Sequence, residues 1–108
     1  MAFDPLSEFD ATPDAGAVES GELAVTDDVL VKAFALGPDA SIPPHEHGDA
    51  TNVFHVLRGT VTVERDDETE TVSAPGVVLN ERGQIHGAHN DSDVVAVLTV
   101  RRCPLPGQ

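Results

Sequence analysis

Six segments of the chain are rich in Val, Thr and Leu, and many alternate apolar and polar residues with the period of two that a β-strand requires. They are residues 29–36, 52–57, 60–65, 69–74, 77–80 and 93–102. Turn-forming residues separate them, as in Gly37-Pro38-Asp39 and Ala74-Pro75-Gly76. No segment has the apolar stripe and caps of an amphipathic helix, so the pattern predicts an all-β sandwich or barrel. Its predicted core is Phe54, Val56, Val61, Val63, Val78, Val95, Val97 and Leu98.

The first 20 residues lack this alternation. Residues 1–20 mix Asp, Pro, Gly and Ser, which predicts an extended arm, followed by one barrel domain in residues 21–108. Phe3, Leu6 and Phe9 recur at every third position. That spacing fits either one short helical turn or three anchors on a partner surface, and we favour the anchors.

The charge of the chain excludes some classes of partner. Nineteen Asp and Glu face six Lys and Arg among 108 residues, for a formal net charge of −13. Such a chain repels nucleic acid and anionic membranes and is typical of halophilic proteins, although an ordinary acidic protein with a solvated surplus of charge is the alternative. No apolar run approaches the roughly 20 residues of a membrane span, and Cys103 has no partner for an internal disulfide. We therefore expect a cytoplasmic protein.

Histidines dominate the candidate chemistry. His45 and His47 have the same parity, so on one strand both side chains point to the same face, which inside a small barrel is the interior. Two imidazoles in an apolar space are costly unless they are protonated, paired or bound to metal. His86 can supply a third nitrogen for zinc, iron, nickel, copper or manganese. The alternative is an exposed His-x-His pair in a Pro-rich loop, with His86 unrelated to it.

Two motifs resemble those of the cupin superfamily. HEHGDATNVFHVLRG resembles the first cupin motif: His45, His47 and Gly59 match, Asn52 stands at the usual Glu position, and Asp39 stands where a leading glycine is usual. GVVLNERGQIHGAHN resembles the second motif, with Gly76, Gly83, His86 and Asn90 matching, one residue fewer after Gly76, and Glu81 in place of proline. The resemblance implies a small single-domain jelly-roll barrel, and a divalent transition metal held by His45, His47 and His86.

Asn52 changes what such a site can do. A metal that lacks the carboxylate ligand is more positive, which makes it a stronger Lewis acid and lowers the pKa of a bound water further. We expect Asn52 to hydrogen-bond a bound water or a substrate, although its amide oxygen can coordinate a metal. The alternative is a neutral residue that fills space where no metal binds.

Other polar residues have simpler interpretations. His55 has the opposite parity to Asn52, so it should point away from the site. His89 is out of phase with His86 but is a candidate proton carrier at the barrel mouth; a surface role is the alternative. Glu46 should face outward. Either Arg101 or Arg102 can point inward to meet an anionic substrate, or the pair can balance local acidic residues.

Two functional classes remain open. In the first, the protein is a small metal-dependent enzyme of the isomerase or lyase type that acts on a polar, sugar-like or carboxylate metabolite. Asn52 and His89 are its candidate catalytic residues, and a three-histidine iron dioxygenase is a variant of this class. In the second class, the barrel binds a metal or small molecule as a sensor or store. Open sheet edges and the apolar arm predict a homodimer in either case.

Overall fold

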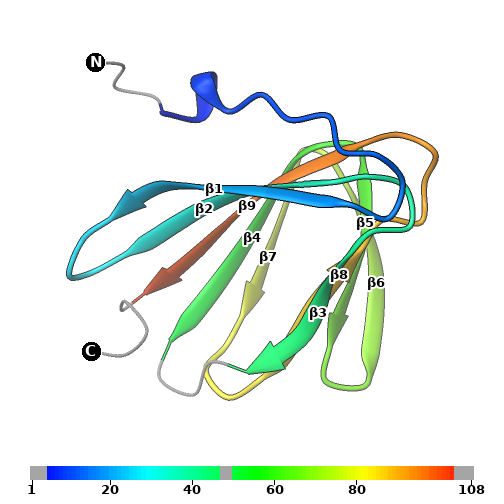
Figure 1. The fold of residues 1–108 in the computed structure, drawn as a ribbon. Coiled ribbons are helices and arrows are strands. Elements are labelled where there is room, and N and C mark those ends of the chain that lie inside the picture. The colour runs from blue at the N-terminus through cyan, green and yellow to red at the C-terminus, as the bar shows by residue number, and fades with distance from the viewer. Residues whose placement is uncertain (1–4, 47–49, 104–108) are drawn as a thin grey trace.

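Two antiparallel β-sheets make up the protein (Figure 1). The computed structural model describes residues 5–46 and 50–103, and of these all side chains except those of Pro5, Ser7, His45 and Glu46. The first sheet has the strand order β1-β2-β9-β4-β7, and the second has the order β3-β8-β5-β6. The strands are β1 (Val18–Val25), β2 (Leu30–Leu36), β3 (Ser41–Glu46), β4 (Thr51–Arg58), β5 (Thr60–Arg65), β6 (Glu68–Ser73), β7 (Gly76–Asn80), β8 (Ile85–His89) and β9 (Ala96–Cys103).

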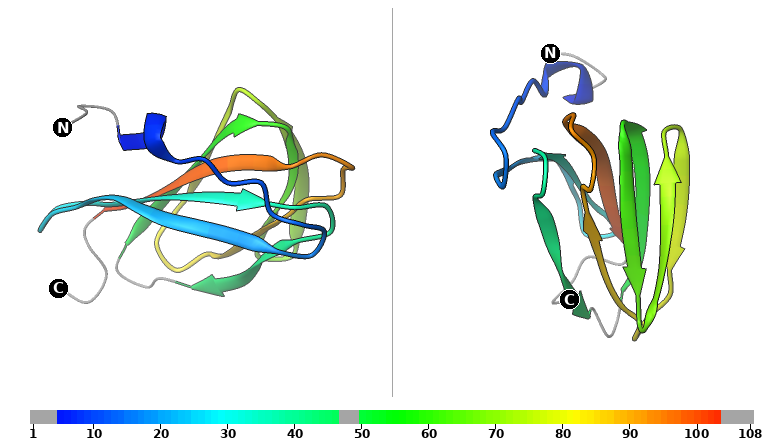
Figure 2. Two further views of the ribbon diagram at one scale, coloured as in Figure 1. Left: turned by 45° about the horizontal axis from the view of Figure 1, so that its top comes forward. Right: turned by 90° about the vertical axis from the view of Figure 1, so that its right-hand side faces the viewer.

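The two sheets pack face to face and enclose the core (Figure 2). Along β4, residues 51 to 57 alternate between half-buried and buried, and the buried positions include Phe54 and Val56. Strand β5 contributes Val61 and Val63 in the same way. Period-two alternation places these side chains between the sheets, which confirms the predicted all-β barrel.

Prediction and structure differ at several strands. The alternation does not predict β1, whose side chains are mostly exposed, or β8, which lacks a run of β-branched residues. Strand β3 contains two consecutive prolines, Pro43 and Pro44. It lies at the edge of its sheet, where a missing backbone N–H costs little.

The predicted core is confirmed in part. Phe54, Val56, Val61, Val63 and Leu98 are buried, and Val78 packs against them. Val97 lies on the outer face of β9 because its neighbour Leu98 faces inward, and adjacent strand residues point to opposite faces. Val95 precedes β9 and is only half-buried. The prediction missed the other buried members of the core, which are Leu36, Ala40, Ile42, Ala88, Ala96 and Val100.

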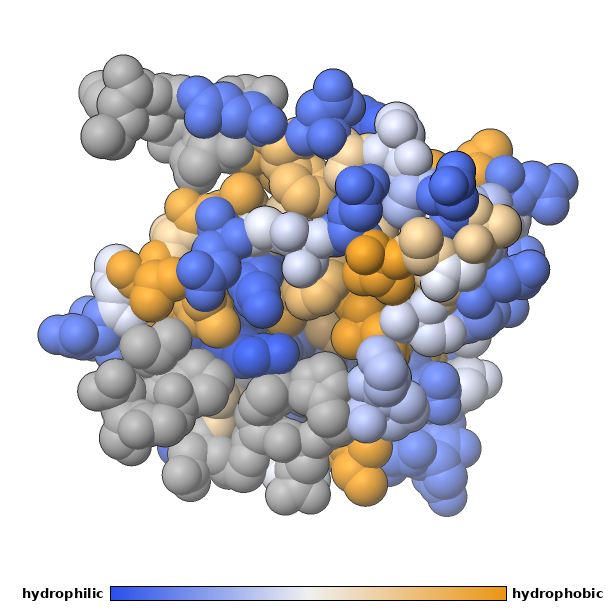
Figure 3. All heavy atoms as spheres, viewed as in Figure 1, coloured by the Kyte–Doolittle hydropathy of each residue, from blue (hydrophilic) through white to orange (hydrophobic). Residues whose placement is uncertain are grey.

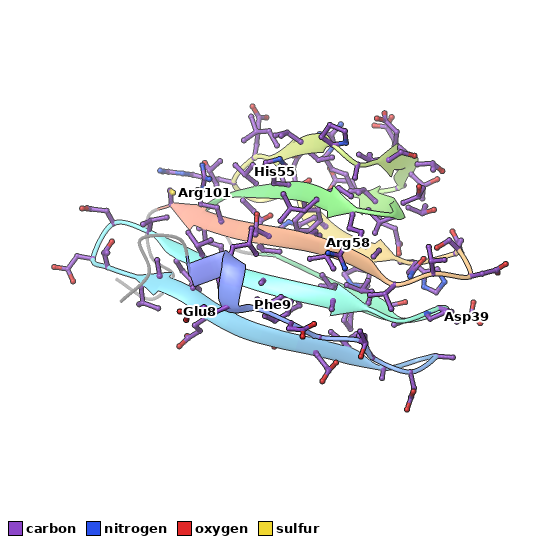
Figure 4. The ribbon with its side chains drawn as sticks, turned by 90° about the horizontal axis from the view of Figure 1, so that it is seen from above. Glu8, Phe9, Asp39, His55, Arg58 and Arg101 are labelled. Carbon is purple, nitrogen blue, oxygen red and sulfur yellow. The ribbon has the colours of Figure 1, made fainter. Side chains whose placement is uncertain are left out.

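The described part of the N-terminal arm, which begins at residue 5, lies on the outer face of the first sheet. It contains the 3-10 helix η1 (Pro5–Glu8), so the helical turn that the spacing allowed is present. Figure 4 shows η1, Glu8 and Phe9 over this sheet. Phe9 lies against Gly21 of β1, where an added Cβ would meet the Phe9 ring at 3.5 Å. Strand β1 begins at Val18, so the last residues of the predicted arm belong to the sheet.

Among the turns that need a left-handed backbone, two bear on the first motif. Gly59, between β4 and β5, has a φ of 76°, which glycine adopts without steric cost. Asp39 has a φ of 65°, and Asp is one of the few other residues that tolerate this region. A left-handed backbone at position 39 explains how Asp39 can stand where the first motif usually has glycine.

The surface is mainly polar with scattered apolar residues. Figure 3 shows hydrophilic side chains at the lower right, over the β5–β6 hairpin. Five of the six side chains of β6 are exposed, and they include Glu68 and Glu70. No helix within the described residues has the length and apolar composition of a membrane span.

Candidate metal centre

Strand pairing brings two of the predicted ligands opposite each other. In the β3–β8 pair, His45 is the register partner of His86, and in the β8–β5 pair, His86 is the partner of Arg65. Residues paired in register share a face of the sheet. His86 is 1% exposed, so this face is the interior.

The imidazole of His86 is held in one orientation. Its Nδ1 lies 3.1 Å from the carbonyl oxygen of Gln84. Because a carbonyl only accepts hydrogen bonds, Nδ1 is the donor in this contact. Phe54 packs against the ring edge to face, with centroids 5.7 Å apart and an interplanar angle of 79°. This carbonyl-bound tautomer is the one that metal-ligating histidines commonly adopt.

The other two predicted ligands can be followed only in part. The backbone of His45 lies in β3, but its side chain and all of His47 lie outside the described residues. Without these side chains, no three His, Cys, Asp or Glu residues in the described part of the chain form a group that could hold a metal. What the structure describes of the set, a buried His86 whose Nδ1 donates to a carbonyl and the backbone of His45 across from it in register, fits a histidine metal site.

Asn52 forms a buried amide pair with Asn80, a residue that the sequence analysis did not identify. Asn52 on β4 is the register partner of Asn80 on β7, and both are 0% exposed. The Nδ2 of Asn80 donates to the Oδ1 of Asn52 over 3.4 Å. The Nδ2 of Asn52 and the Oδ1 of Asn80 have no hydrogen-bond partner among the described residues. An unsatisfied buried amide costs about 1–3 kcal/mol, so a bound water or ligand at Asn52 would be favoured.

The amide pair can present either kind of polar atom. Exchanging oxygen and nitrogen in both amides preserves the hydrogen bond between them, because each side chain carries a donor and an acceptor. In one arrangement Asn52 offers an N–H to a water or substrate, and in the other it offers a carbonyl oxygen. Asn80 has the same parity as Val78, a predicted core residue on the same predicted strand, and this is the sequence signal that could have identified Asn80 as inward-facing.

Of the two terminal arginines, Arg102 faces inward. Arg102 is the register partner of Asn52 in the β4–β9 pair, and it is half-buried. Burial lowers the pKa of its guanidinium. Arg101 is exposed and pairs with Val53. Figure 4 shows Arg101 on the outer face of the first sheet, so only Arg102 lies beside the candidate centre.

His55 and His89 both point away from the interior. His55 pairs with Val77 and Thr99 on the outer face of the first sheet (Figure 4). His89 lies on the outer face of the second sheet, since the next residue back, Ala88, faces the core.

Three side chains surround His89. Its Nδ1 contacts the Oγ of Ser41, and its Nε2 lies 3.1 Å from the carboxylate of Asp91. Thr62 donates to the other oxygen of Asp91 over 2.6 Å. His89 therefore does not lie beside Asn52, which faces inward from the first sheet. The contacts of His89 match the surface role that the sequence analysis gave as the alternative.

A groove of about 490 Å³ lies between the edge strands β6 and β7. Its apolar lining comes from Val63, Val72, Val77, Val78 and Leu79, and its polar lining from Arg65, Glu68, Thr69, Glu70, Glu81 and Gln84. Gln84 holds the His86 ring and Arg65 is the register partner of His86, so the groove lies beside the candidate centre. Three carboxylates make it a poor site for an anion.

Comparison with known families gives one match that covers most of the chain. The family model described as the cupin domain matches residues 32–100. Germin-like protein 5-1 of Oryza sativa subsp. japonica is 36% identical over 85 residues, which are 73% of this chain and 38% of that protein. The chain therefore spans well under half the length of this relative.

Solved structures share the fold at low sequence identity. TT1209 from Thermus thermophilus superposes with a TM-score of 0.88 at 23% identity, covering 98% of this chain and 100% of that one. KdgF from Halomonas sp. gives a TM-score of 0.82 at 19% identity, covering 99% and 96%. A predicted oxalate decarboxylase from Thermotoga maritima gives 0.77 at 18% identity, covering 82% and 81%. At these identities the likeness is one of fold alone.

Proposed function

Because this chain belongs to the cupin domain family, whose members often bind divalent metals, we propose that it is a small metal-dependent enzyme acting on a polar metabolite. In this proposal, His45, His47 and His86 hold one divalent transition metal. The bound metal would supply Lewis acidity. The isomerase or lyase type fits best, because those reactions need a polarised carbonyl or hydroxyl group and no external oxidant.

The observation that carries the proposal is the state of His86. His86 is buried and donates from Nδ1 to a backbone carbonyl, which is the contact that metal-ligating histidines commonly make with the nitrogen that does not bind the metal. His45 lies opposite it in register. A core histidine that served packing alone would not need a histidine across the strand pair.

The chain itself would position the substrate. Asn52 offers a donor or an acceptor from a fully buried site, so it can hold one oxygen of a substrate or a water in a fixed place. Asn80 and Phe54 limit the motion of Asn52 and His86, respectively. The apolar core beneath them keeps bulk water away, and this strengthens polar interactions at the site.

The variant Asn52→Glu tests this arrangement. A carboxylate here would add a negative ligand, so we expect the affinity for Zn²⁺ to rise by about tenfold or more. When metal-free, the variant should melt at a lower temperature than the wild type, because a buried carboxylate is costly. On metal binding, its melting temperature should rise by more than that of the wild type. Turnover of any substrate found should fall, because the added charge weakens the Lewis acid. Competition with a chelator and thermal melting measure the first two effects.

Asn52→Gln is the matched control, because Gln has the length of Glu without its charge. We expect its Zn²⁺ affinity to stay near that of the wild type. Equal Zn²⁺ affinities in the Glu and Gln variants would show that position 52 does not face the metal.

We also propose that the chain forms a homodimer in a salt-rich cytoplasm. Val77 and Leu79 on the edge strand β7 are 66% and 50% exposed, which favours contact with a second copy. Two copies of net charge −13 repel each other. From 0.1 to 1 M salt the Debye length falls from about 10 Å to about 3 Å, so the dimer fraction and the melting temperature should both rise. Light scattering that gives a monomer mass at both salt concentrations would refute the dimer, and a flat melting temperature would refute the adaptation to salt.

A further inference from the structure

The few positive charges of this acidic chain are not spread evenly. Lys and Arg number six against nineteen Asp and Glu. Three of the six lie on the inner faces of the sheets: Arg102 pairs with the buried Asn52, Arg65 with the buried His86, and Lys32 with the buried Val100. Charged groups are rarely turned toward a barrel interior unless something there uses them.

Arg65 has a structural use. Its Nη1 donates to the carbonyl oxygen of Leu79 over 3.0 Å, which ties the second sheet to β7 of the first. Glu68 is its register partner on β6. Arg65 therefore bridges the two sheets beside the acidic groove, where an anion would be repelled.

Lys32 and Arg102 lie on the same face of neighbouring strands. Lys32 on β2 is paired with Val100 on β9, which is two residues from Arg102 on the same face. Diagonal neighbours of this kind lie about 7–8 Å apart at the backbone, so both side chains can reach one small group between them. The Lys32 ammonium lies 5.7 Å from the centre of the Phe34 ring, which packs against the core. Glu22 of β1, the register partner of Lys32, is exposed.

We propose that Arg102 and Lys32 form a subsite that binds the carboxylate of a small organic acid beside Asn52. Arg102 directly neighbours Asn52 in register, so an acid held by its carboxylate presents its adjoining oxygen to the Asn52 amide. The inference deepens the proposed function by naming the substrate class, and it rests on that function only for the role of the metal.

The chemistry of the two side chains suits this role. The planar guanidinium of Arg102 matches a carboxylate with two parallel hydrogen bonds, and the Lys32 ammonium adds a point charge. The net charge of −13 repels anions at long range, so selective binding of an acid requires local positive charge of this kind.

The test is an NMR titration of the full chain with acetate, D-glucuronate and D-glucose, first with chelator present and then with Zn²⁺. Glucuronate and glucose form a matched pair of probes that differ by the carboxylate. We expect both acids to shift the signals of Asn52 and its strand neighbours, and glucose to shift none at the same concentration. Arg102→Gln should weaken glucuronate binding by about tenfold or more, and Lys32→Gln by a smaller factor.

Arg101→Gln is the control variant. It removes the same charge from the adjacent residue, which lies on the outer face (Figure 4), and should leave glucuronate affinity within a factor of about two. Equal weakening by the Arg101 and Arg102 variants, equal binding of glucose and glucuronate, or no binding of either acid would overturn the subsite. Lys32→Gln keeps the test decisive if the Arg102 variant does not fold.

The two proposals fail separately. Binding of glucuronate through Arg102 in a protein that takes up no Zn²⁺ would refute the metal-dependent function and support the subsite. Normal Zn²⁺ uptake with glucuronate affinity unchanged in both the Arg102 and Lys32 variants would refute the subsite alone.

Discussion

Replacing His86 with alanine is expected to remove nearly all the bound metal. His86 supplies a buried imidazole that is already oriented by Gln84 and Phe54, and two histidines alone leave a metal under-coordinated. Because loss of a mere supporting contact costs about 10- to 100-fold in metal affinity, loss of a ligand should cost more than about 100-fold. Elemental analysis of protein purified without added metal, followed by chelator competition, measures the effect.

The matched controls are His55→Ala and His89→Ala. Both histidines lie on outer faces, His55 beside Val77 and His89 beside Asp91, so metal content should stay at the wild-type level. Thermal melting of each metal-free variant separates loss of a ligand from loss of the fold. Equal metal content in the wild type and in a folded His86→Ala protein would eliminate the three-histidine site.

Asn90→Ala should produce the largest loss of stability, about 3–5 kcal/mol in the free energy of unfolding. Asn90 is 0% exposed, and its Nδ2 donates to the carbonyl oxygens of Leu36, Gly37 and Val94 at 2.9, 3.2 and 2.8 Å. Its Oδ1 accepts from the backbone N–H of Ser92 at 2.9 Å and from the hydroxyl at 2.7 Å. Removing the amide takes one partner from each of these groups, while the carbonyl of Gly37 still accepts from the N–H of Ala40 and that of Val94 from the Ser92 hydroxyl. Urea denaturation measures the change.

Ser92→Ala provides the control for the Asn90 prediction. It removes the hydroxyl contacts with Asn90 and Val94 but keeps the backbone N–H, so we expect a loss of about 1 kcal/mol. A loss below about 1 kcal/mol for Asn90→Ala would show that the loop does not depend on this side chain. The presence of asparagine at position 90, where it matches the second motif, would then need an explanation other than stability.

Local sequence pattern was sufficient to predict the fold class and the inward residues of regular strands. Alternation in β4 and β5 identifies Phe54, Val56, Val61 and Val63 as core, because the period of two is a property of any strand. The same parity predicts that Asn52 faces inward and His55 outward, as the structure shows. It fails at β9, where the run of apolar residues is continuous and Val97 and Leu98 cannot both face the core.

The chain by itself determined which residues can share a face, but only the tertiary structure decided which of them meet. Arg101 and Arg102 are equivalent by composition, and the pairing of β9 with β4 places Arg102 beside Asn52. Lys32 and Asn80 reach the site in the same way, because β2 pairs with β9 and β7 pairs with β4. Register between distant strands is set by the packing of the whole core, and a shift of one residue would turn every one of these side chains to the opposite face.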